Sequence, residues 1–301
     1  MILIADSGST KTDWCGLYKG RTNRLKTQGI NPFHQTTDMI QSLLYKELLP
    51  QLPVEPVEAI YFYGAGCTAE RGGLVRDCLL KVFGEQTHIE VHSDLLGAAR
   101  AMCGHNPGIV CILGTGSNSC YYDGRKIDSQ VPSLGYILGD EGSGAYFGKR
   151  LVSDCLKHLL PQDLEKLLME GYGLSMEKAI LQVYRMPLPN RYLAGFAPFL
   201  SQHRERLEIQ ALIHEGFTAF VQRNLKHYPQ GMPVYVIGTV AYTFKEELKE
   251  VLAGNGYMQV EVAQSPMKGL VKFHKEEDTN QIKKENKTNG FPQDNRRKFG
   301  I

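Results

Sequence analysis

Residues 1–14 read MILIADSGSTKTDW, and this stretch decides the fold. The apolar run Met1–Ala5 ends in the acid Asp6, and the small residues Ser7-Gly8-Ser9-Thr10-Lys11 follow at once. An apolar run of this length before small turn residues is typical of a buried strand. Backbone N–H groups and hydroxyls in such a turn can hold a phosphate, and an acid beside it can hold Mg²⁺, directly or through water. The alternative is an ordinary hairpin turn rich in serine and glycine.

A second stretch, GIVCILGTGSNSCYY at residues 108–122, repeats this pattern. The apolar run Ile109–Leu113 precedes the small, hydroxyl-rich turn Gly114-Thr115-Gly116-Ser117-Asn118. The order predicts two strands joined by a tight hairpin that binds phosphate. Neither turn has the P-loop pattern or the glycine fingerprint of dinucleotide-binding folds. Two such units predict a duplicated nucleotide-binding core, with phosphates held between two lobes.

Length and charge narrow the classes of function. A chain of 301 residues can bury a large core and is expected to divide into two domains. Residues 275–301 hold seven of the 34 basic and five of the 32 acidic side chains, so the remainder of the chain is neutral. This balance leaves no basic surface for a nucleic acid. The sequence shows no apolar run long enough for a membrane span and no secretory signal, so we expect no membrane partner.

Cysteine and histidine usage argues against a zinc site and against an iron–sulfur site built from this chain alone. The seven cysteines contain no C-x-x-C pair, and several lie in apolar surroundings. We therefore expect buried free thiols, which fits a cytoplasmic protein in a reducing compartment. An iron–sulfur site would need ligands from partner chains. The histidines show no zinc-site spacing, and His92 is expected to be a core or edge residue.

Strands and helices alternate along the chain. A meander of three strands is expected first, then two strands separated by helices, and the order restarts at Gly108. This predicts an α/β protein with mixed sheets and helices on their faces. The second half is expected to carry longer helices, whose apolar faces are compatible with a homodimer. The expected strands are Met1–Ala5, Asp13–Tyr18, Arg24–Gln28, Ala59–Tyr63, Thr87–His92, Ile109–Leu113, Pro233–Ile237 and Met258–Ala263, and the longer helices Gly144–Leu160, Glu177–Tyr184, Arg191–Gln202 and Leu207–Lys226.

Asp94 lies at a predicted junction between a strand and a helix. A carboxylate at this point can accept the proton of a substrate hydroxyl that attacks a γ-phosphorus. The alternative is a helix N-cap, a position that Asp also favours. Taken alone, the residue pattern favours the cap.

Three further loops carry candidate binding residues. Asp140 and Glu141, in a glycine-rich loop, suit hydrogen bonds to vicinal sugar hydroxyls, or else complement the dipole of a following helix. Gly238-Thr239 follows a strand and either allows the close approach of a base or ribose, or forms an ordinary turn. Asn31 follows the third strand and can bind a sugar hydroxyl or an acetamide, although turn chemistry also explains it.

Six segments occur in an order that resembles a known family. They are DSGSTKTDW at 6–14, YGAGC at 63–67, HSDLLGAARA at 92–101, LGTGSNS at 113–119, LGYILGDEGSGAYFGKR at 134–150 and VIGTVA at 236–241. The set resembles the BadF/BadG-type ATPase family, and specifically its N-acetylglucosamine kinase branch, within the actin, hexokinase and heat-shock-70 superfamily. The resemblance covers residues 1–274. It implies two ribonuclease-H-like lobes, at 1–106 and 107–274, around a central cleft for ATP, Mg²⁺ and an amino sugar.

The resemblance also implies a role for each matching residue. Asp6 helps to hold Mg²⁺ through water, and Asp94 is the general base for the sugar 6-hydroxyl, so the base is preferred to the cap. ATP would contact the first phosphate loop (Gly8, Ser9, Thr10 and Lys11), the second phosphate loop (Gly114, Thr115 and Gly116) and the adenosine loop (Gly238 and Thr239). The amino-sugar contacts would be Asn31, Asp94, Ser117, Asn118 and Asp140.

The chain departs from this family at two places. The adenosine loop reads Gly-Thr where Gly-Gly or Gly-Ser is more usual, and residues 275–301 have no counterpart, because the family's chains commonly end near Phe273-His274. The composition of these last residues predicts a disordered tail. The kinase is favoured over an ATP-driven activator of a radical dehydratase and over a non-catalytic sugar sensor. The sequence leaves open which amino sugar is used.

Overall fold

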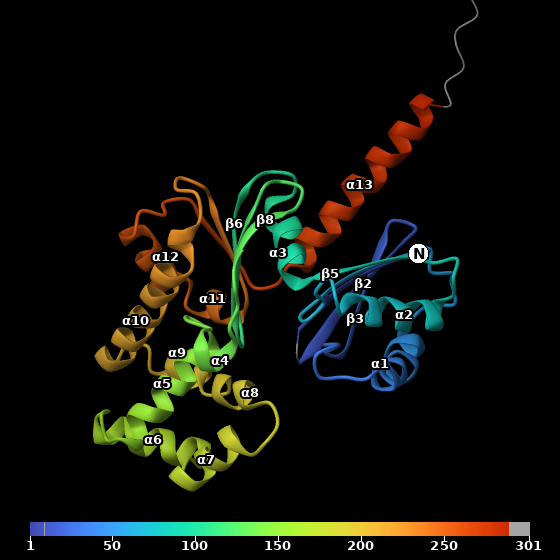
Figure 1. Cartoon of the computed structure of the whole chain (residues 1–301). Coiled ribbons are helices and arrows are strands. Elements are labelled where there is room, and N and C mark those ends of the chain that lie inside the picture. Colours follow the sequence, from blue (N-terminus) through green and yellow to red (C-terminus); the bar gives the residue numbers. More distant parts are fainter. Residues whose placement is uncertain (9, 289–301) are drawn as a thin grey trace, which may run out of the picture.

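Two five-stranded sheets form the centres of two lobes (Figure 1). The computed structural model describes residues 1–8 and 10–288, with residues 278–288 described by their backbone alone. The first sheet has the order β3-β2-β1-β4-β5, and the second has the order β10-β9-β6-β7-β8. Counted from its other edge, the second sheet repeats the first, since an antiparallel meander of three strands is continued by two parallel strands. The predicted α/β class with mixed sheets is confirmed.

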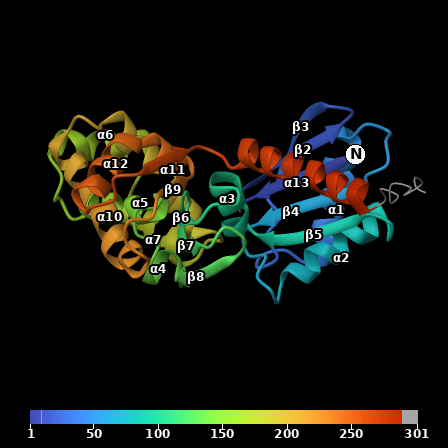
Figure 2. The ribbon, with the colours of Figure 1, turned by 90° about the horizontal axis from the view of Figure 1, so that it is seen from above.

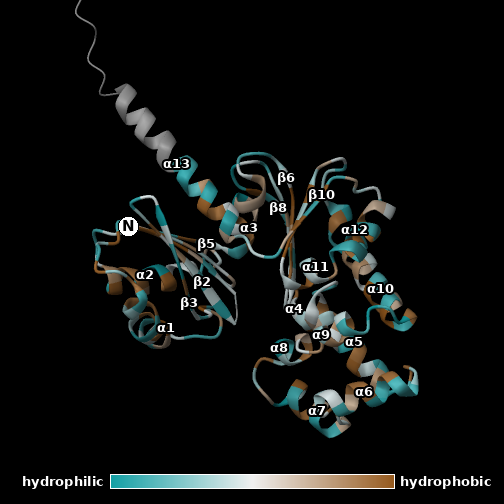
Figure 3. Ribbon diagram, turned by 180° about the vertical axis from the view of Figure 1, so that it is seen from behind, coloured by the Kyte–Doolittle hydropathy of each residue, from teal (hydrophilic) through white to brown (hydrophobic). Residues whose placement is uncertain are grey.

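Most strands follow the expected ranges closely, but β8 was not expected and β3 begins three residues before the expected Arg24. The central strands β1 and β6 are apolar and almost wholly buried, because helices cover both faces of each sheet (Figure 3). The first sheet contains β1 (Ile2–Ser7), β2 (Lys11–Tyr18), β3 (Arg21–Gln28), β4 (Ala59–Gly64) and β5 (His88–Ser93). The second contains β6 (Gly108–Leu113), β7 (Ser117–Tyr122), β8 (Ile127–Val131), β9 (Val234–Ile237) and β10 (Val260–Ala263).

Helices cover one face of each sheet from within its own lobe. In the first lobe these are α1 (Thr37–Leu43), continued by a π-helical turn over Leu44–Leu48 and a 3₁₀ turn over Leu49–Gln51, and α2 (Gly72–Phe83). The helices of the second lobe are α4 (Gly135–Leu138), α5 (Gly144–Leu156), α6 (Gln162–Tyr172), α7 (Met176–Tyr184), α8 (Pro189–Ala194), α9 (Ala197–Gln202), α10 (Leu207–Arg223), α11 (Thr239–Thr243) and α12 (Lys245–Gly254), with a 3₁₀ turn over Leu225–His227.

Two helices cross between the lobes and cover the other face of each sheet. Helix α3 (Asp94–Cys103) follows the last strand of the first sheet, yet its apolar side packs on β6 and β7 of the second. Helix α13 (Met267–Thr288) follows the last strand of the second sheet and packs on β1 of the first, with Met267 and Leu270 against Ile4. The two helices also contact each other, and Figure 2 shows α3 between the sheets.

Helices α4 and α6 were not expected, and α5 ends at Leu156 rather than Leu160. Two further expectations about helices differ from the structure. The single helix expected over Arg191–Gln202 is two helices, α8 and α9, which are separated near Gly195 and the following Pro198. Residues 275–288, expected from their composition to be disordered, continue helix α13. The packed start of that helix provides the costly nucleus, and each further residue adds a hydrogen bond at little cost. The rest of the expected tail, 289–301, lies outside the described residues.

Two further expectations can be compared with the structure. All seven cysteines are buried and free, as predicted. None of the helices in the described part of the chain combines the length and the apolar character that crossing a bilayer requires.

Candidate active site

The first group of candidate residues gathers where three parallel strands end. Ser7 of β1 pairs with Gly64 of β4, and Gly64 pairs with Ser93 of β5, so the strands end at the same level. Ligands of open α/β sheets bind at the carboxyl ends of such strands. Asp6 on β1 and Asp94, directly after β5, therefore lie at one edge of the first sheet.

Both of these acids are partly buried, and this changes their titration. Burial, followed by the negative charges of Asp94 and Asp13, raises the pKa of Asp6 to about 7, although Lys11 opposes the change. Burial raises the pKa of Asp94 to about 6, against a hydrogen bond of 2.9 Å that the Leu95 backbone N–H donates to Asp94 Oδ1. A carboxylate that titrates near neutral pH is suited to general-base catalysis.

Helix α3 is capped by Ser93. The Ser93 side-chain oxygen accepts a hydrogen bond of 3.2 Å from the Leu96 backbone N–H, and Asp94 is the first helical residue. The interpretation of Asp94 as the N-cap is therefore wrong, because the N-cap of α3 is Ser93. The Asp94 carboxylate accepts hydrogen bonds from backbone N–H groups, those of Leu95 and of Asp94 itself.

The first phosphate loop is an exposed turn between β1 and β2. The Gly8 N–H donates to the Lys11 carbonyl at 3.0 Å and closes the turn, whose residues Gly8, Thr10 and Lys11 are exposed. Lys11 Nζ forms an ion pair of 2.7 Å with Asp13 Oδ2. Ser9, the other predicted contact in this loop, lies outside the described residues.

Buried hydrogen bonds connect the residues at the base of this turn. The Ser7 hydroxyl is buried, lies 2.7 Å from the Thr12 hydroxyl and accepts a hydrogen bond of 2.9 Å from the Ile30 N–H. These bonds hold β1, β2 and the chain after β3 together. The exposed turn is therefore presented on a fixed support.

Asn31 is buried beside the first sheet, where its side-chain oxygen has a structural role. Asn31 Oδ1 accepts a hydrogen bond of 2.9 Å from the Phe33 N–H, and Gly66 packs so closely that a Cβ there would collide with Oδ1. This is the local turn chemistry of Asn, so that interpretation is confirmed for Oδ1. Asn31 could contact a substrate through its Nδ2 or through the second lone pair of Oδ1.

The second phosphate loop, between β6 and β7, is fixed by helix α5. The Gly114 N–H donates to the Gly116 carbonyl at 3.0 Å. The Gly144 N–H donates to the Gly114 carbonyl at 2.8 Å, and the Ala145 N–H to the Thr115 carbonyl at 3.0 Å. Backbone N–H groups that the start of a helix leaves without intrahelical partners thus hold the loop.

The adenosine loop lies against the second phosphate loop. Gly238 has φ +134°, and a Cβ at this position would collide with the Leu113 carbonyl oxygen and come within 3.2 Å of the Gly114 nitrogen. Only glycine combines this conformation with this closeness. Thr239 is exposed and is the first residue of α11.

Asp140 is buried behind the second phosphate loop in a left-handed conformation, with φ 59°. Asp140 Oδ1 accepts a hydrogen bond of 3.1 Å from the Ser117 N–H. Burial raises the pKa of Asp140, and the charge of Glu141 adds to this, against the Ser117 bond. Ser143 caps helix α5, and no acid lies in its first turn, so the helix-dipole interpretation of Asp140 and Glu141 is wrong.

Asn118 is directed toward the edge strand of the second sheet. Its Oδ1 accepts hydrogen bonds from the Ser119 N–H at 2.9 Å and from Gln130 Nε2 of β8 at 3.0 Å. Ser117 and Asp140 are brought into direct contact, whereas the side-chain oxygen of Asn118 is held by β8.

Two residues that were not assigned a role from the sequence help to arrange the site. Ser93 is the helix cap in place of Asp94, and Gly66 packs against Asn31. Their signals were present, since a serine before a helical apolar pattern is an N-cap signature, and Gly66 belongs to the quoted YGAGC segment.

The acids of the first sheet fit a Mg²⁺ ion that is held through water molecules. Among the described residues, no group of three or more His, Cys, Asp or Glu side chains is arranged to hold a metal ion. Mg²⁺ commonly keeps several waters and takes only one or two carboxylates together with substrate phosphates. The charge of Asp6 is disfavoured by burial and by Asp94, and a cation would relieve both effects.

Solved structures that resemble this chain extend over nearly all of it. A "putative N-acetylglucosamine kinase" from Porphyromonas gingivalis is 45% identical, with a TM-score of 0.87, over 91% of this chain and 98% of the other. A second protein of the same description, from Chromobacterium violaceum, is 19% identical, with a TM-score of 0.67, over 90% and 98%. A ROK family glucokinase from Streptomyces griseus, in complex with glucose and AMPPNP, is 18% identical, with a TM-score of 0.52, over 90% and 97%.

These similarities differ in what they show. The last two structures establish the two-lobed α/β fold alone. The Porphyromonas gingivalis protein is similar enough, in identity and in coverage, to show the family as well as the fold. No family model and no curated protein matches the chain.

Proposed function

Because this chain belongs to the N-acetylglucosamine kinase branch of the BadF/BadG-type ATPase family, we propose that it is an ATP-dependent sugar kinase. Its proposed reaction is transfer of the γ-phosphoryl group of ATP to the 6-hydroxyl of N-acetylglucosamine or a close N-acetylhexosamine. The observation that carries the proposal is the placement of Asp94 beside Asp6 at the strand ends, with the helix cap supplied by Ser93.

Asp94 is the proposed general base. With a pKa of about 6 it is mostly ionised at pH 7, so it can accept the proton of the sugar 6-hydroxyl as that oxygen bonds to the γ-phosphorus and ADP leaves. A positioned base contributes about 10²–10⁴ to the rate. The rest of the catalysis of phosphoryl transfer is positioning and charge stabilisation.

The two turns are the proposed phosphate sites. Lys11 would supply charge from the first turn, and the backbone N–H groups of Thr115 and Gly116 would supply hydrogen bonds from the second. Asp6 would hold Mg²⁺ through water, and the ion when bound neutralises charge on the β- and γ-phosphates. Gly238 and Thr239 are placed against the second turn, which suits an adenosine site that continues from the phosphates.

The amino sugar is proposed to contact both lobes. Asn31 and Asp94 would contribute from the first lobe, and Ser117, Asn118 and Asp140 from the second. The direct contact of Asp140 with the Ser117 N–H supports their joint assignment. For Asn118 the proposal requires that its oxygen give up Gln130, or that its Nδ2 make the contact.

The test is ADP release with Mg-ATP against a panel of sugars with and without the N-acetyl group. We expect strong turnover with N-acetylglucosamine and little with glucose, with phosphate found on the 6-oxygen. The absence of turnover with every sugar, while ATP still binds, would contradict the proposal. Iron analysis of the purified protein would then separate a dehydratase activator from a sugar sensor.

A homodimer in the cytoplasm is a further part of the proposal. Helix α7 carries exposed apolar side chains at Met176, Ile180 and Tyr184, a pattern that suits a surface between copies. The free buried thiols fit a reducing compartment. Sedimentation analysis would check the dimer.

A further inference from the structure

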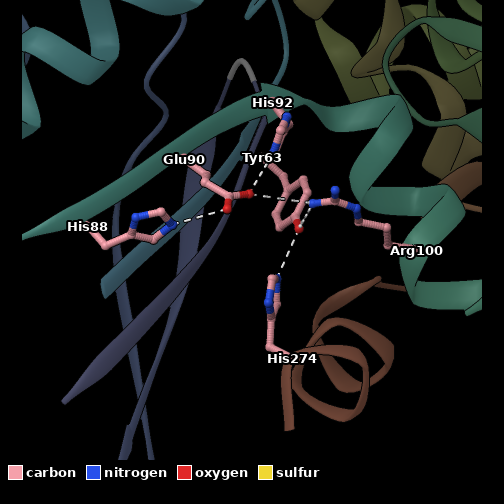
Figure 4. A network of polar contacts seen from close by, with 6 residues as sticks. All are labelled: Tyr63, His88, Glu90, His92, Arg100 and His274. Carbon is pink, nitrogen blue, oxygen red and sulfur yellow. Dashed lines mark hydrogen bonds and ion pairs between the residues drawn. The ribbon is translucent and has the colours of Figure 1, made fainter. Parts of the chain in front are cut away.

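A cluster of polar side chains lies where α3 and α13 meet the first sheet (Figure 4). Its centre is the buried Tyr63 of β4. The Tyr63 oxygen accepts a hydrogen bond of 2.8 Å from Arg100 Nη1 of α3 and lies 2.9 Å from His274 Nε2 of α13. One hydroxyl therefore joins an inner strand to both helices that cross between the lobes.

The chemistry of the three groups fixes the direction of both hydrogen bonds. A guanidinium can only donate, so the Tyr63 oxygen accepts from Arg100 and its own proton is left for His274. His274 Nε2 must then be unprotonated. Burial, followed by the charge of Arg100, lowers the pKa of His274 to about 4, so the ring is neutral at pH 7. The bonds thus form an ordered chain from Arg100 through Tyr63 to His274.

On the side of α13, aromatic rings hold the residues of this series of hydrogen bonds in place. The His274 ring stacks on Tyr61 of β4 with centroids 3.9 Å apart. The Arg100 guanidinium lies 5.3 Å from the centroid of Phe273. Residues at the end of the second lobe's chain therefore contact a strand and a helix that belong to the first.

On its other side the cluster is bounded by Glu90 of β5. Glu90 lies 2.9 Å from His92 and 3.1 Å from His88, but 4.0 Å from Arg100. Among the described residues, Arg100 Nε is buried without a hydrogen-bond partner. The short contact that orients the guanidinium is therefore the one with Tyr63.

Backbone contacts connect the cluster to the start of α3. Gly97, about one turn after Asp94, packs on Tyr63 so closely that a Cβ there would lie 2.8 Å from the Tyr63 Cβ. Gly269 of α13 packs against the Ala101 carbonyl of α3 in the same way. A small shift at Tyr63 would therefore move the helix that begins with Asp94.

We propose that Tyr63, Arg100 and His274 are positioning residues for Asp94. They fix helix α3 against the first sheet, and they tie this alignment to α13, which comes from the second lobe. The inference rests on the proposed role of Asp94. The rate of phosphoryl transfer then depends in part on the Tyr63 hydroxyl, although this group contacts neither ATP nor the sugar.

The test is the variant Tyr63→Phe, which keeps the ring contacts and removes only the hydroxyl. We expect kcat to fall about tenfold while KM for the sugar and for ATP stays within about twofold, since misplacement of a base acts on the chemical step. The matched control is Tyr122→Phe, which removes the buried hydroxyl that donates to the Gly104 carbonyl, 3.2 Å away, at the far end of α3. The control should keep the wild-type kcat.

A second variant tests whether the hydroxyl acts through His274. His274→Phe keeps an aromatic ring on Tyr61 and removes the acceptor. If both variants interrupt the same series of hydrogen bonds, the kcat of the double variant should be no lower than the kcat of Tyr63→Phe alone. A Tyr63→Phe enzyme with a lower unfolding temperature but wild-type kcat, or with a change in KM alone, would overturn the inference.

Hydrogen exchange separates this inference from the proposed function. If the wild-type protein phosphorylates no sugar, the proposed function fails, and the alignment of α3 can still be measured. We expect the amides of Leu95 to Ala98 to exchange faster in Tyr63→Phe than in Tyr122→Phe. Equal exchange in the two variants would overturn the inference without reference to turnover.

Discussion

The two sheets have the same strand order, but the residues at their strand ends present different chemistry. In the first sheet, Asp6 is the last residue but one of β1, Asp94 directly follows β5, and the turn after β1 is exposed with a lysine in it. In the second, β9 leads into Gly238, and the turn after β6 is fixed by the backbone of α5. Topology gives each lobe the same place for a ligand. At that place the first lobe supplies charged side chains, and the second lobe supplies backbone groups.

The largest expected effect comes from breaking the acidic side of this comparison. Asp94→Asn should lower turnover by about 10²–10⁴, because the base is lost, and should leave sugar binding largely intact. Steady-state kinetics with a sugar-binding measurement would check it.

The control for this substitution is Asp77→Asn, which changes an exposed acid of α2 and should keep wild-type turnover. An Asp94→Asn enzyme with more than a tenth of the wild-type rate would end the assignment of Asp94 as the base.

A smaller effect is expected from breaking the backbone side. Gly238→Ala places a side chain at φ +134° against the Leu113 carbonyl, and should lower the free energy of unfolding by about 1–3 kcal/mol and raise KM for ATP. Gly73→Ala, in α2 of the first lobe, meets no atom within 4 Å and should leave that free energy unchanged or raise it by about 0.5 kcal/mol. Denaturant unfolding of both variants would test this contrast, which equal stabilities would refute.

The smallest effect concerns stability against pH and sharpens the comparison of charge. The pKa values of Asp6, about 7, and Asp94, about 6, lie above the ordinary value of 3.8. The folded state therefore binds these protons more tightly than the unfolded state, and both acids destabilise the fold most at pH 8 and progressively less as the pH falls toward 4.

Asp6→Asn should accordingly raise the unfolding temperature by a few degrees at pH 8 and by less at pH 5. Thermal unfolding without Mg²⁺ measures this difference, and an equal change at both pH values would count against the assigned pKa. The same argument predicts that wild-type turnover declines below about pH 6, where the Asp94 base becomes protonated.

Much of each lobe could be predicted from local pattern. The apolar runs before small turns gave the strands at 1–5, 109–113 and 233–237 nearly as the structure has them, because a strand buried on both faces reads as a continuous apolar run. Helix ends were less predictable. The break between α8 and α9 and the continuation of α13 depend on packing partners that periodicity does not describe.

The candidate site divides in the same way. Sequence by itself determined which residue types stand at the strand ends, and it gave Asp6, Asp94 and the two turns as candidates, because those signals are contiguous along the chain. Only the tertiary structure decided that Ser93 is the cap, that Oδ1 of Asn118 is held by Gln130, and that Tyr63 meets both Arg100 and His274. Tyr63 and His274 are 211 residues apart, and their contact exists because α3 and α13 each cross to the other lobe's sheet, an exchange that hydrophobic patterning along one segment does not encode.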